Sequence, residues 1–463
     1  MSFSNKPVCV IQGPVETRSG YGDHTRDLIH SLIKYDKFDV KIVPMPWGGT
    51  PRTALDEDTE DNLKLKSRFL TQNLNAQPEL HVQISIPNEF QPQGKYNIGI
   101  TAGIESSLCR GEWIEGLNRM NMNIVPSKHA LKVFKDSKFK KRDEQGMEHP
   151  IELSKPVEVL FEGSDTDIYK KTSKIEPSVK DLFSGIKEDF CFLFVGHWLQ
   201  GKPGEDRKDI YMMIKTFCEV FKNQKNPPAL VLKTSGATFS EIDKDECLRK
   251  IKQSKSGVDG KLPPVYLIHG EFTADEINSL YNHPNVKAHV SFTHGEGYGR
   301  PLQEASISGK PVIASDWSGH VDFLDKELAV MLPGEVKQIP GGAANDWLIR
   351  ESSWFNVNYS VAAQKLYDVY KNYNKYVPKA EKLAKRNKEK FSLTAMDTEF
   401  AKILDQYVPK FGATTAINLP QLKKTGGGSA PSAGGIQLPK LKKVGEDQKD
   451  DKIQIKLPKL KKK

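Results

Sequence analysis

The feature of this sequence that most constrains its fold is an alternation of short β-branched runs with amphipathic stretches. In the first half, helical stretches include 24–32 and 112–117, and strand-like runs occur at 8–12, 40–43, 80–85, 97–101, 122–125 and 157–161. The pattern then restarts, with helical stretches at 211–221 and 274–281 and strand-like runs at 190–195, 229–233, 265–268, 287–292 and 311–314. Such an alternation predicts an α/β fold, in which parallel sheets carry helices on both faces.

The restart also predicts how the chain divides, because 463 residues are too many for one ordinary core. We expect an N-terminal Rossmann-like domain at 1–170 and a C-terminal Rossmann-like domain at 171–392, with the boundary near 165–179. A late helical stretch predicts a C-terminal helix at 393–410 that packs back on the N-terminal domain. Thr273 and Glu276 have capping-box spacing, which predicts a helix start directly after Thr273.

Beyond Lys410 the composition changes. The segment 426–435 reads GGGSAPSAGG, a flexible linker by composition. Around it a six-residue LPxLKK unit recurs three times, at 419–424, 438–443 and 457–462. The segment 411–463 holds 12 Lys and 4 acidic residues, so it carries most of the formal net charge of +9. We expect a disordered basic tail that binds nucleic acid or a repetitive protein assembly, the alternative being a tail that only solubilises.

Targeting and metal signals are weak. No uninterrupted apolar run is long enough to span a bilayer. The polar start of the chain lacks the features of a signal peptide, so we expect a cytoplasmic protein. The five cysteines are scattered without metal-ligand spacing, which favours reduced thiols and predicts no metal site.

The strongest local signal is the segment 294–311, HGEGYGRPLQEASISGKP, which lies between two strand-like runs. Pro301 stands where a first helical turn is expected, and Gly309 stands where the helix should stop. The pattern therefore predicts a short helix at 302–308 preceded by a glycine-rich loop. The N-terminus of such a helix binds anions through its free N–H groups and dipole.

Two carboxylates flank this predicted anion site. Glu304, expected in the first helical turn, is suited to bind a vicinal diol, and Glu296 on the loop is suited to bind hydroxyls at the other end of the ligand. Gly295, Gly297 and Gly299 permit a close approach of the backbone to a ligand. Hydroxyls at both ends with phosphate between them describe a nucleotide sugar.

The segment resembles the E-x7-E motif of family 4 glycosyltransferases, which have the GT-B fold of two Rossmann-like domains facing a cleft. The resemblance covers roughly residues 7–408. Further segments agree with the family in the same order, namely 19–32 (SGYGDHTRDLIHSL), 125–134 (VPSKHALKVF), 159–169 (VLFEGSDTDIY), 194–217 and 230–234 (LVLKT). The resemblance implies that the donor contacts include Gly295, Gly297, Tyr298, Gly299, Arg300 and Glu304.

In that family a basic pair after the first strand of the donor domain holds the diphosphate. Lys208 with Arg207 fits one member of this pair, and with Glu296 they are the catalytic candidates. The Arg that usually follows the strand's glycine is absent, because Gly196 is followed by His197 and Trp198. The loop 199–206 offers Lys202 as a substitute.

The remaining candidates rest on position alone. Gly20 and Gly22 would let the N-terminal loop close over the diphosphate, and His24 is a candidate contact for sugar or acceptor. Asp23 is interpreted as a helix cap. Other candidates follow strands whose carboxyl ends meet in the cleft, as ligand sites in such sheets do, namely Glu105, His320 and Asp322.

Taken together, these motifs predict a glycosyltransferase that moves a sugar from a nucleotide-sugar donor to an unidentified acceptor. The resemblance implies retention of anomeric configuration without a metal, and no cofactor is expected beyond the donor. Asp165 and Asp167 have bare D-x-D spacing but read as a turn between the domains. Two alternatives stay open: transfer to a modified base in DNA, or a catalytically idle GT-B scaffold acting through its basic tail.

Overall fold

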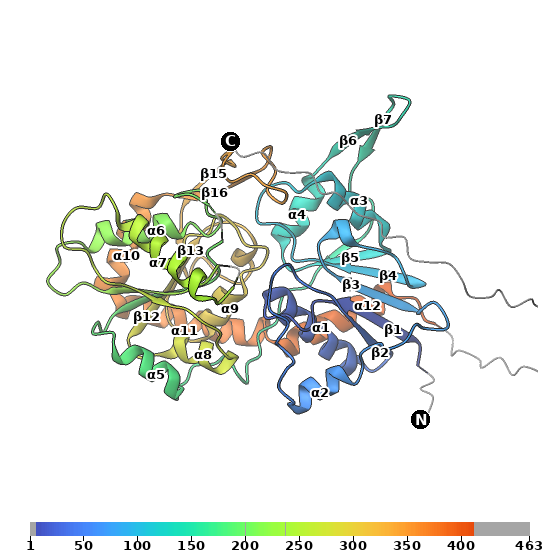
Figure 1. Cartoon of the computed structure of the whole chain (residues 1–463), viewed down its shortest axis with the longest axis horizontal. Helices are drawn as coiled ribbons and strands as arrows, with labels where there is room; N and C mark the ends of the chain where they lie inside the picture. The colour runs from blue at the N-terminus through green and yellow to red at the C-terminus, as the bar shows by residue number, and fades with distance from the viewer. Residues whose placement is uncertain (1–5, 200, 237, 412–463) are drawn as a thin grey trace, which may run out of the picture. The chain divides into compact units, whose positions relative to one another are not determined.

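The computed structural model describes residues 6–199, 201–236 and 238–411. Its first sheet has six parallel strands in the order β2-β1-β3-β4-β5-β8 (Figure 1). They are β1 (Val8–Gly13), β2 (Asp39–Pro44), β3 (Leu80–Ile84), β4 (Tyr96–Ile100), β5 (Met122–Val125) and β8 (Val157–Val159). Every residue of β3 and β5 is buried, as expected for strands covered on both faces.

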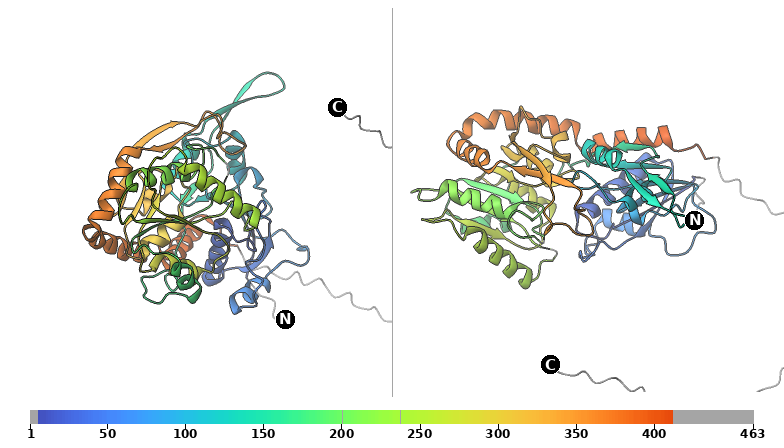
Figure 2. Two further views of the ribbon diagram at one scale, coloured as in Figure 1. Left: turned by 60° about the vertical axis from the view of Figure 1, so that its left-hand side comes forward. Right: turned by 90° about the horizontal axis from the view of Figure 1, so that it is seen from above.

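Helices connect these strands, namely α1 (Gly20–Tyr35), α2 (Glu60–Lys66), α3 (Gly111–Arg119) and α4 (Lys128–Asp136), with the 3-10 turn η1 (Pro87–Glu89). Ser19 starts α1, because its hydroxyl accepts a hydrogen bond from the N–H of Gly22 at 3.1 Å. Between α4 and β8 the chain forms an antiparallel hairpin, β6 (Phe139–Arg142) and β7 (Glu148–Ile151). The hairpin extends away from the sheet in Figure 1 and in the left view of Figure 2.

The second sheet also has six parallel strands, in the order β11-β10-β9-β12-β13-β14. They are β9 (Cys191–Val195), β10 (Ala229–Lys233), β11 (Val265–Ile268), β12 (Val286–Ser291), β13 (Val312–Ser315) and β14 (Val330–Leu332). Its helices are α5 (Pro177–Ser184), α6 (Ile210–Phe221), α7 (Glu241–Lys255), α8 (Ala274–Asn282), α9 (Arg300–Ile307), α10 (Tyr359–Lys371) and the 3-10 turn η2 (Gly319–Asp322). We call residues 6–164 and 392–411 the first lobe, and residues 165–391 the second lobe.

The chain crosses between the lobes at two places that lie side by side. Ser164 donates its N–H to the carbonyl of Phe391 at 2.9 Å, and Leu393 donates to the carbonyl of Ser164 at 2.9 Å. After α11 (Tyr373–Lys390), the chain therefore re-enters the first lobe as α12 (Leu393–Tyr407). There α12 lies against α1, and the Ser31 hydroxyl donates to Asp397 at 2.5 Å.

A second hairpin, β15 (Gly334–Gln338) and β16 (Ser353–Val357), belongs to the second lobe in sequence but contacts the first lobe. The loop between its strands carries Ile339, Ala343 and Leu348, which join Trp113 in an apolar cluster of the first lobe. Ser107 donates its N–H to the carbonyl of Ser353 at 2.7 Å. This hairpin therefore ties the two lobes together.

The predicted fold class is confirmed: two parallel α/β sheets follow one another along the chain. The capping box of Thr273 and Glu276 at the start of α8 is present, and Pro301 lies in the first turn of α9. The two hairpins were not predicted. The basic tail falls on residues 412–463, outside the described residues. No helix in the described part of the chain is both long and apolar enough to cross a membrane.

Candidate functional site

The two motifs singled out in the second half of the sequence meet at one edge of the second sheet. Strands β9 and β12 are neighbours, and the strand order reverses between them, which is where ligands bind in open α/β sheets. The chain after β9 leads to Arg207 and Lys208, and the chain after β12 leads through His294 to α9. His294 donates its N–H to the carbonyl of Arg207 at 3.0 Å, so the two loops are directly joined.

Lys208 and Glu296 form the closest ion pair of this site. The Nζ of Lys208 contacts both carboxylate oxygens of Glu296, and the side chains are only 14% and 10% exposed. Burial lowers the pKa of Lys208 against the opposing attraction of Glu296. Burial alone would raise the pKa of Glu296, but Lys208 and Arg207 outweigh it and hold that pKa below its ordinary value. Glu296 is therefore ionised near neutral pH.

Arg207 points to the other lobe. Its Nη1 lies 2.6 Å from Oε1 of Glu105, which follows strand β4. All three predicted catalytic candidates and the predicted acceptor candidate Glu105 thus lie within one electrostatic network. Lys202, proposed as a second phosphate ligand, is exposed at the surface of the loop. The position of the missing arginine is taken by His197, whose Nδ1 lies 3.2 Å from the carbonyl oxygen of Gly236, and the next residue, Trp198, is fully buried in the second lobe.

Helix α9 begins one residue after Gly299, whose φ of +98° requires a glycine. Because the helix starts at Arg300, Glu304 lies in the second turn, and the expectation that it lies in the first turn was wrong. Its Oε1 accepts from Nε of Arg300 at 2.9 Å, and its Oε2 accepts from the Tyr281 hydroxyl at 3.4 Å. Burial raises the pKa of Glu304 to about 7, and Arg300 opposes that shift.

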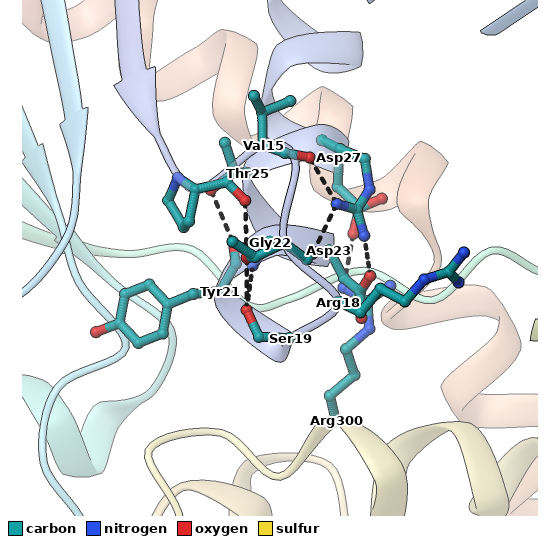
Figure 3. A network of polar contacts seen from close by, with 12 residues as sticks. Val15, Arg18, Ser19, Tyr21, Gly22, Asp23, Thr25, Asp27 and Arg300 are labelled. Carbon is teal, nitrogen blue, oxygen red and sulfur yellow. Dashed lines mark hydrogen bonds and ion pairs between the residues drawn. The ribbon is translucent and has the colours of Figure 1, made fainter. Parts of the chain in front are cut away.

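Arg300 also reaches the first lobe. Its Nη1 donates to Oδ2 of Asp27 on α1 at 2.7 Å, as Figure 3 shows. Asp23 and Glu162 act electrostatically on the same guanidinium. Burial raises the pKa of Glu162 to about 8, although Arg300 lowers it. Asp27 and Glu162 were not among the predicted candidates, although they lie in the segments 19–32 and 159–169 that resemble the family.

The glycines of the loop have contacts that the sequence did not predict. A Cβ on Gly295 would lie 1.9 Å from the carbonyl oxygen of Glu105, and one on Gly297 would lie 2.2 Å from that of Ala102. These glycines therefore let the second lobe approach the backbone of the first lobe. Gly20 and Gly22 were expected in a loop but lie in the first turn of α1, where a Cβ on Gly22 would meet the Thr17 carbonyl at 2.1 Å.

Three further candidates are placed by hydrogen bonds to the protein. Asp23 does not cap α1, as we had interpreted it, because Ser19 does; Asp23 pairs with Arg26 instead. The Nε2 of His320 lies 2.6 Å from the carbonyl of Ser315, and burial lowers the pKa of His320. Asp322 accepts the N–H of Lys128 at 2.8 Å and so bridges the lobes.

His24 and Tyr298 are buried near Arg300. Burial, together with the charge of Arg300, lowers the pKa of His24 to about 3, so His24 is neutral. Tyr298 packs on Phe323 with ring centroids 5.0 Å apart. The side-chain atoms His24 Nδ1 and Tyr298 Oη are buried without a hydrogen-bond partner. Among the described residues, no three His, Cys, Asp or Glu side chains are grouped as metal ligands would be.

Comparison with solved structures shows that this chain has the GT-B fold. HepE of Anabaena in complex with UDP-glucose is 14% identical with a TM-score of 0.52, and the match covers 86% of this chain and 100% of HepE. Sucrose-phosphate synthase of Thermosynechococcus elongatus is 12% identical with a TM-score of 0.54, over 87% and 98% of the two chains. A glycosyltransferase from Rickettsia africae is 11% identical with a TM-score of 0.56, over 88% and 100%. No family model and no curated protein sequence matches the chain.

Proposed function

We propose that this protein is a glycosyltransferase that transfers a sugar from a nucleotide-sugar donor with retention of anomeric configuration and without a metal. The observation that carries the proposal is the ion pair of Lys208 with Glu296 at the reversal point of the second sheet, on the loop that leads into the helix of Glu304. One cation and two carboxylates there match a ligand with phosphate between two groups of hydroxyls. HepE, which shares the fold, is described in complex with UDP-glucose.

In this proposal, the leaving nucleoside diphosphate needs stabilisation of developing negative charge. The ammonium of Lys208 has three donors, and Glu296 holds it beside the N-terminal loop of α9. Glu296 orients sugar hydroxyls, and the unused acceptor sites of Glu304 receive the ribose diol. Arg207, held by Glu105, is the second cation within reach of the phosphates. The acceptor enters from the first lobe.

Nucleotide binding tests the proposal most directly. Calorimetry with a panel of nucleoside diphosphates and their sugar conjugates should find at least one ligand. Glu304→Ala should weaken its binding by about 1.5–3 kcal/mol, the scale of a lost charged hydrogen bond. Glu327→Ala, an exposed carboxylate on the same lobe, is the matched control and should leave binding unchanged. Equal affinities for the two variants would refute the assignment of Glu304.

Metal independence is tested separately. Donor hydrolysis should continue at the same rate in excess EDTA, because the cations that face the leaving group are protein side chains. Loss of turnover in EDTA with recovery in Mn²⁺ or Mg²⁺ would show that a metal takes part. Absence of any donor hydrolysis or nucleotide binding would favour the alternative of an idle GT-B scaffold.

The charge of the tail favours a second candidate, transfer to or retention on nucleic acid. Most of the formal net charge of +9 lies in 411–463 rather than in the two lobes. Polyanion binding through lysines is strongly dependent on salt. Retention on duplex DNA that falls steeply between 50 and 200 mM salt would support a nucleic-acid partner for the tail.

A further inference from the structure

Arg300 differs from the other cations of the site because it contacts carboxylates of both lobes. Its Nε donates to Glu304, four residues further along α9, and its Nη1 donates to Asp27 on α1. The three side chains are 14%, 7% and 15% exposed, so the bridge is largely removed from solvent. In Figure 3 the side chain of Arg300 extends from α9 toward α1 and contacts Asp27.

The bridge depends on the shape of guanidinium. Two different nitrogen atoms serve two carboxylates, and a planar guanidinium fixes the angle between them. Because Asp27 holds one edge of the group, only one nitrogen faces Glu304, and one further acceptor site on each oxygen of Glu304 stays open. Without Asp27, the guanidinium is able to turn both edges toward Glu304 and to occupy the acceptors that a ligand would use.

We infer that Asp27 is a positioning residue for the donor: it acts across the lobes, through Arg300, on the orientation of Glu304. The inference rests on the proposed function of Glu304 and adds to it a link between donor binding and the approach of α1 to α9. Asp27 touches neither the donor nor the reacting atoms in this scheme. Donor affinity therefore depends on a carboxylate of the opposite lobe.

The surroundings support a bridge rather than a simple excess of charge. Asp23 and Glu162 from the first lobe also act electrostatically on Arg300. Tyr281 on α8 donates a hydrogen bond to Glu304. Tyr169 and Tyr298 lie within electrostatic range of both Arg300 and Glu304. Burial raises the pKa values of Asp27, Glu162 and Glu304, and Arg300 opposes all three shifts. Arg300 is thus the cation that favours the ionised, hydrogen-bond-accepting form of Glu304.

The fold offers a matched control. Arg18 and Glu271 form another ion pair between the lobes, with Nε and Oε2 3.3 Å apart. Arg18 lies directly before Ser19, the residue that caps α1, and Glu271 follows β11. This pair has no contact with Glu304. Glu271→Ala therefore removes an ionic link between the lobes without disturbing the acceptor.

The first experiment measures the dissociation constant of whichever nucleoside diphosphate the wild-type protein binds. Asp27→Ala should raise it about fivefold to twentyfold, in the lower range of coupling between sites. Glu271→Ala should change it less than about twofold, the scale of an exposed pair. Asp27→Glu should restore most of the affinity, and Arg300→Lys, which keeps charge but loses the planar fork, should resemble Asp27→Ala. In a Glu304→Gln background, Asp27→Ala should have no further effect.

Equal effects of Asp27→Ala and Glu271→Ala on the dissociation constant would overturn the inference. So would an undiminished effect of Asp27→Ala in the Glu304→Gln background. Near-ultraviolet circular dichroism and the thermal midpoint identify any variant that fails to fold, and the milder Asp27→Asn then replaces Asp27→Ala.

A second experiment tests the bridge without a ligand. Denaturant midpoints are measured for Asp27→Ala, Glu304→Gln and the double variant, in wild-type and Arg300→Leu backgrounds. The double variant should shift the midpoint by less than the sum of the single shifts, and the shifts should become additive in Arg300→Leu. Additivity in the wild-type background would overturn the bridge itself. A wild-type protein that binds no nucleotide would refute the proposed function, while non-additive midpoints would still uphold the bridge.

Discussion

The two lobes have sheets of the same size but different strand orders, and at the site two ion pairs join a cation of the second lobe to a carboxylate of the first. In the second sheet, the three strands β9 to β11 run outward in reverse order beside β12, the arrangement of dinucleotide-binding sheets. In the first sheet, only β1 and β2 are reversed. The second lobe presents the cations Lys208, Arg207 and Arg300. The first lobe presents carboxylates, of which Glu105 contacts Arg207 and Asp27 contacts Arg300.

The repeated six-stranded sheet therefore does not by itself assign a role to each lobe. The roles come from the loops, because the charged side chains that follow the strands differ between the lobes. In the proposed function, the phosphates of the donor bind the cations of the second lobe rather than the carboxylates of the first. We therefore expect the donor to bind the second lobe and the acceptor to approach from the first.

The strongest test of this division is removal of the buried cation. Lys208→Ala should lower donor hydrolysis by about a hundredfold or more, the scale of a lost charge-stabilising donor. It should also reduce stability by about 3–5 kcal/mol, because Glu296 is left buried without its partner. Lys202→Ala, on the same loop but exposed, should leave both quantities nearly unchanged. Initial rates and urea unfolding of the two variants check this, and equal loss in both would remove the distinction between them.

The next test compares glycines of the two lobes. Gly297→Ala places a Cβ 2.2 Å from the carbonyl oxygen of Ala102, so we expect a loss of about 1–3 kcal/mol in the free energy of unfolding. Gly20→Ala meets no atom within 4 Å and should be neutral or stabilising by about 0.5 kcal/mol. Thermal unfolding measures both. Similar stability of the two variants would mean that the lobes do not approach each other as closely as described.

A smaller effect is expected from the buried acid of the first lobe. Because the folded-state pKa of Glu162 is raised to about 8, the unfolded state releases its proton first, and stability falls as pH rises from about 4.5 to 8. Glu162→Gln cannot ionise, so this part of the decline should disappear. We expect a relative gain of about 1 kcal/mol for each pH unit between pH 5 and pH 8. Urea midpoints across pH 5–8 check the prediction, and parallel curves for the two proteins would contradict it.

The smallest effect on chemistry is expected from removing the tail. Truncation after Lys410 should leave donor hydrolysis unchanged, since the charged groups of the site all lie within the two lobes. Retention on DNA at low salt should fall. Leu→Ala in all three LPxLKK units tests a protein-binding motif, whereas Lys→Gln tests purely electrostatic binding. Loss of hydrolysis on truncation would show that the tail belongs to the catalytic body.

Most of the fold could be predicted from local patterns of apolar and polar residues in the sequence. The strand-like runs at 122–125 and 229–233 match β5 and β10, and α12 begins at Leu393 as expected. The hairpins β6–β7 and β15–β16 were not predicted, because charged residues such as Lys140 and Glu335 dominate the exposed strands β6 and β15 and leave no apolar alternation there. Asp23 was misassigned because an acidic residue near a helix start fits a cap as well as an ion pair.

The two parallel sheets and the glycine-rich loop before a short helix could be predicted from the sequence, because periodicity, Pro301 and the glycines act within a few residues of each other. Which charges meet depends on the tertiary structure. Lys208 and Glu296 are 88 residues apart in the chain, and Asp27 and Arg300 are 273 apart. Lys208 and Glu296 meet because strands β9 and β12 are neighbours in one sheet, whereas Asp27 and Arg300 meet where the two lobes pack. In both places burial strengthens the charge interaction. The same packing gave Gly295 and Gly297 their second role, since only facing backbones reveal where a side chain would not fit.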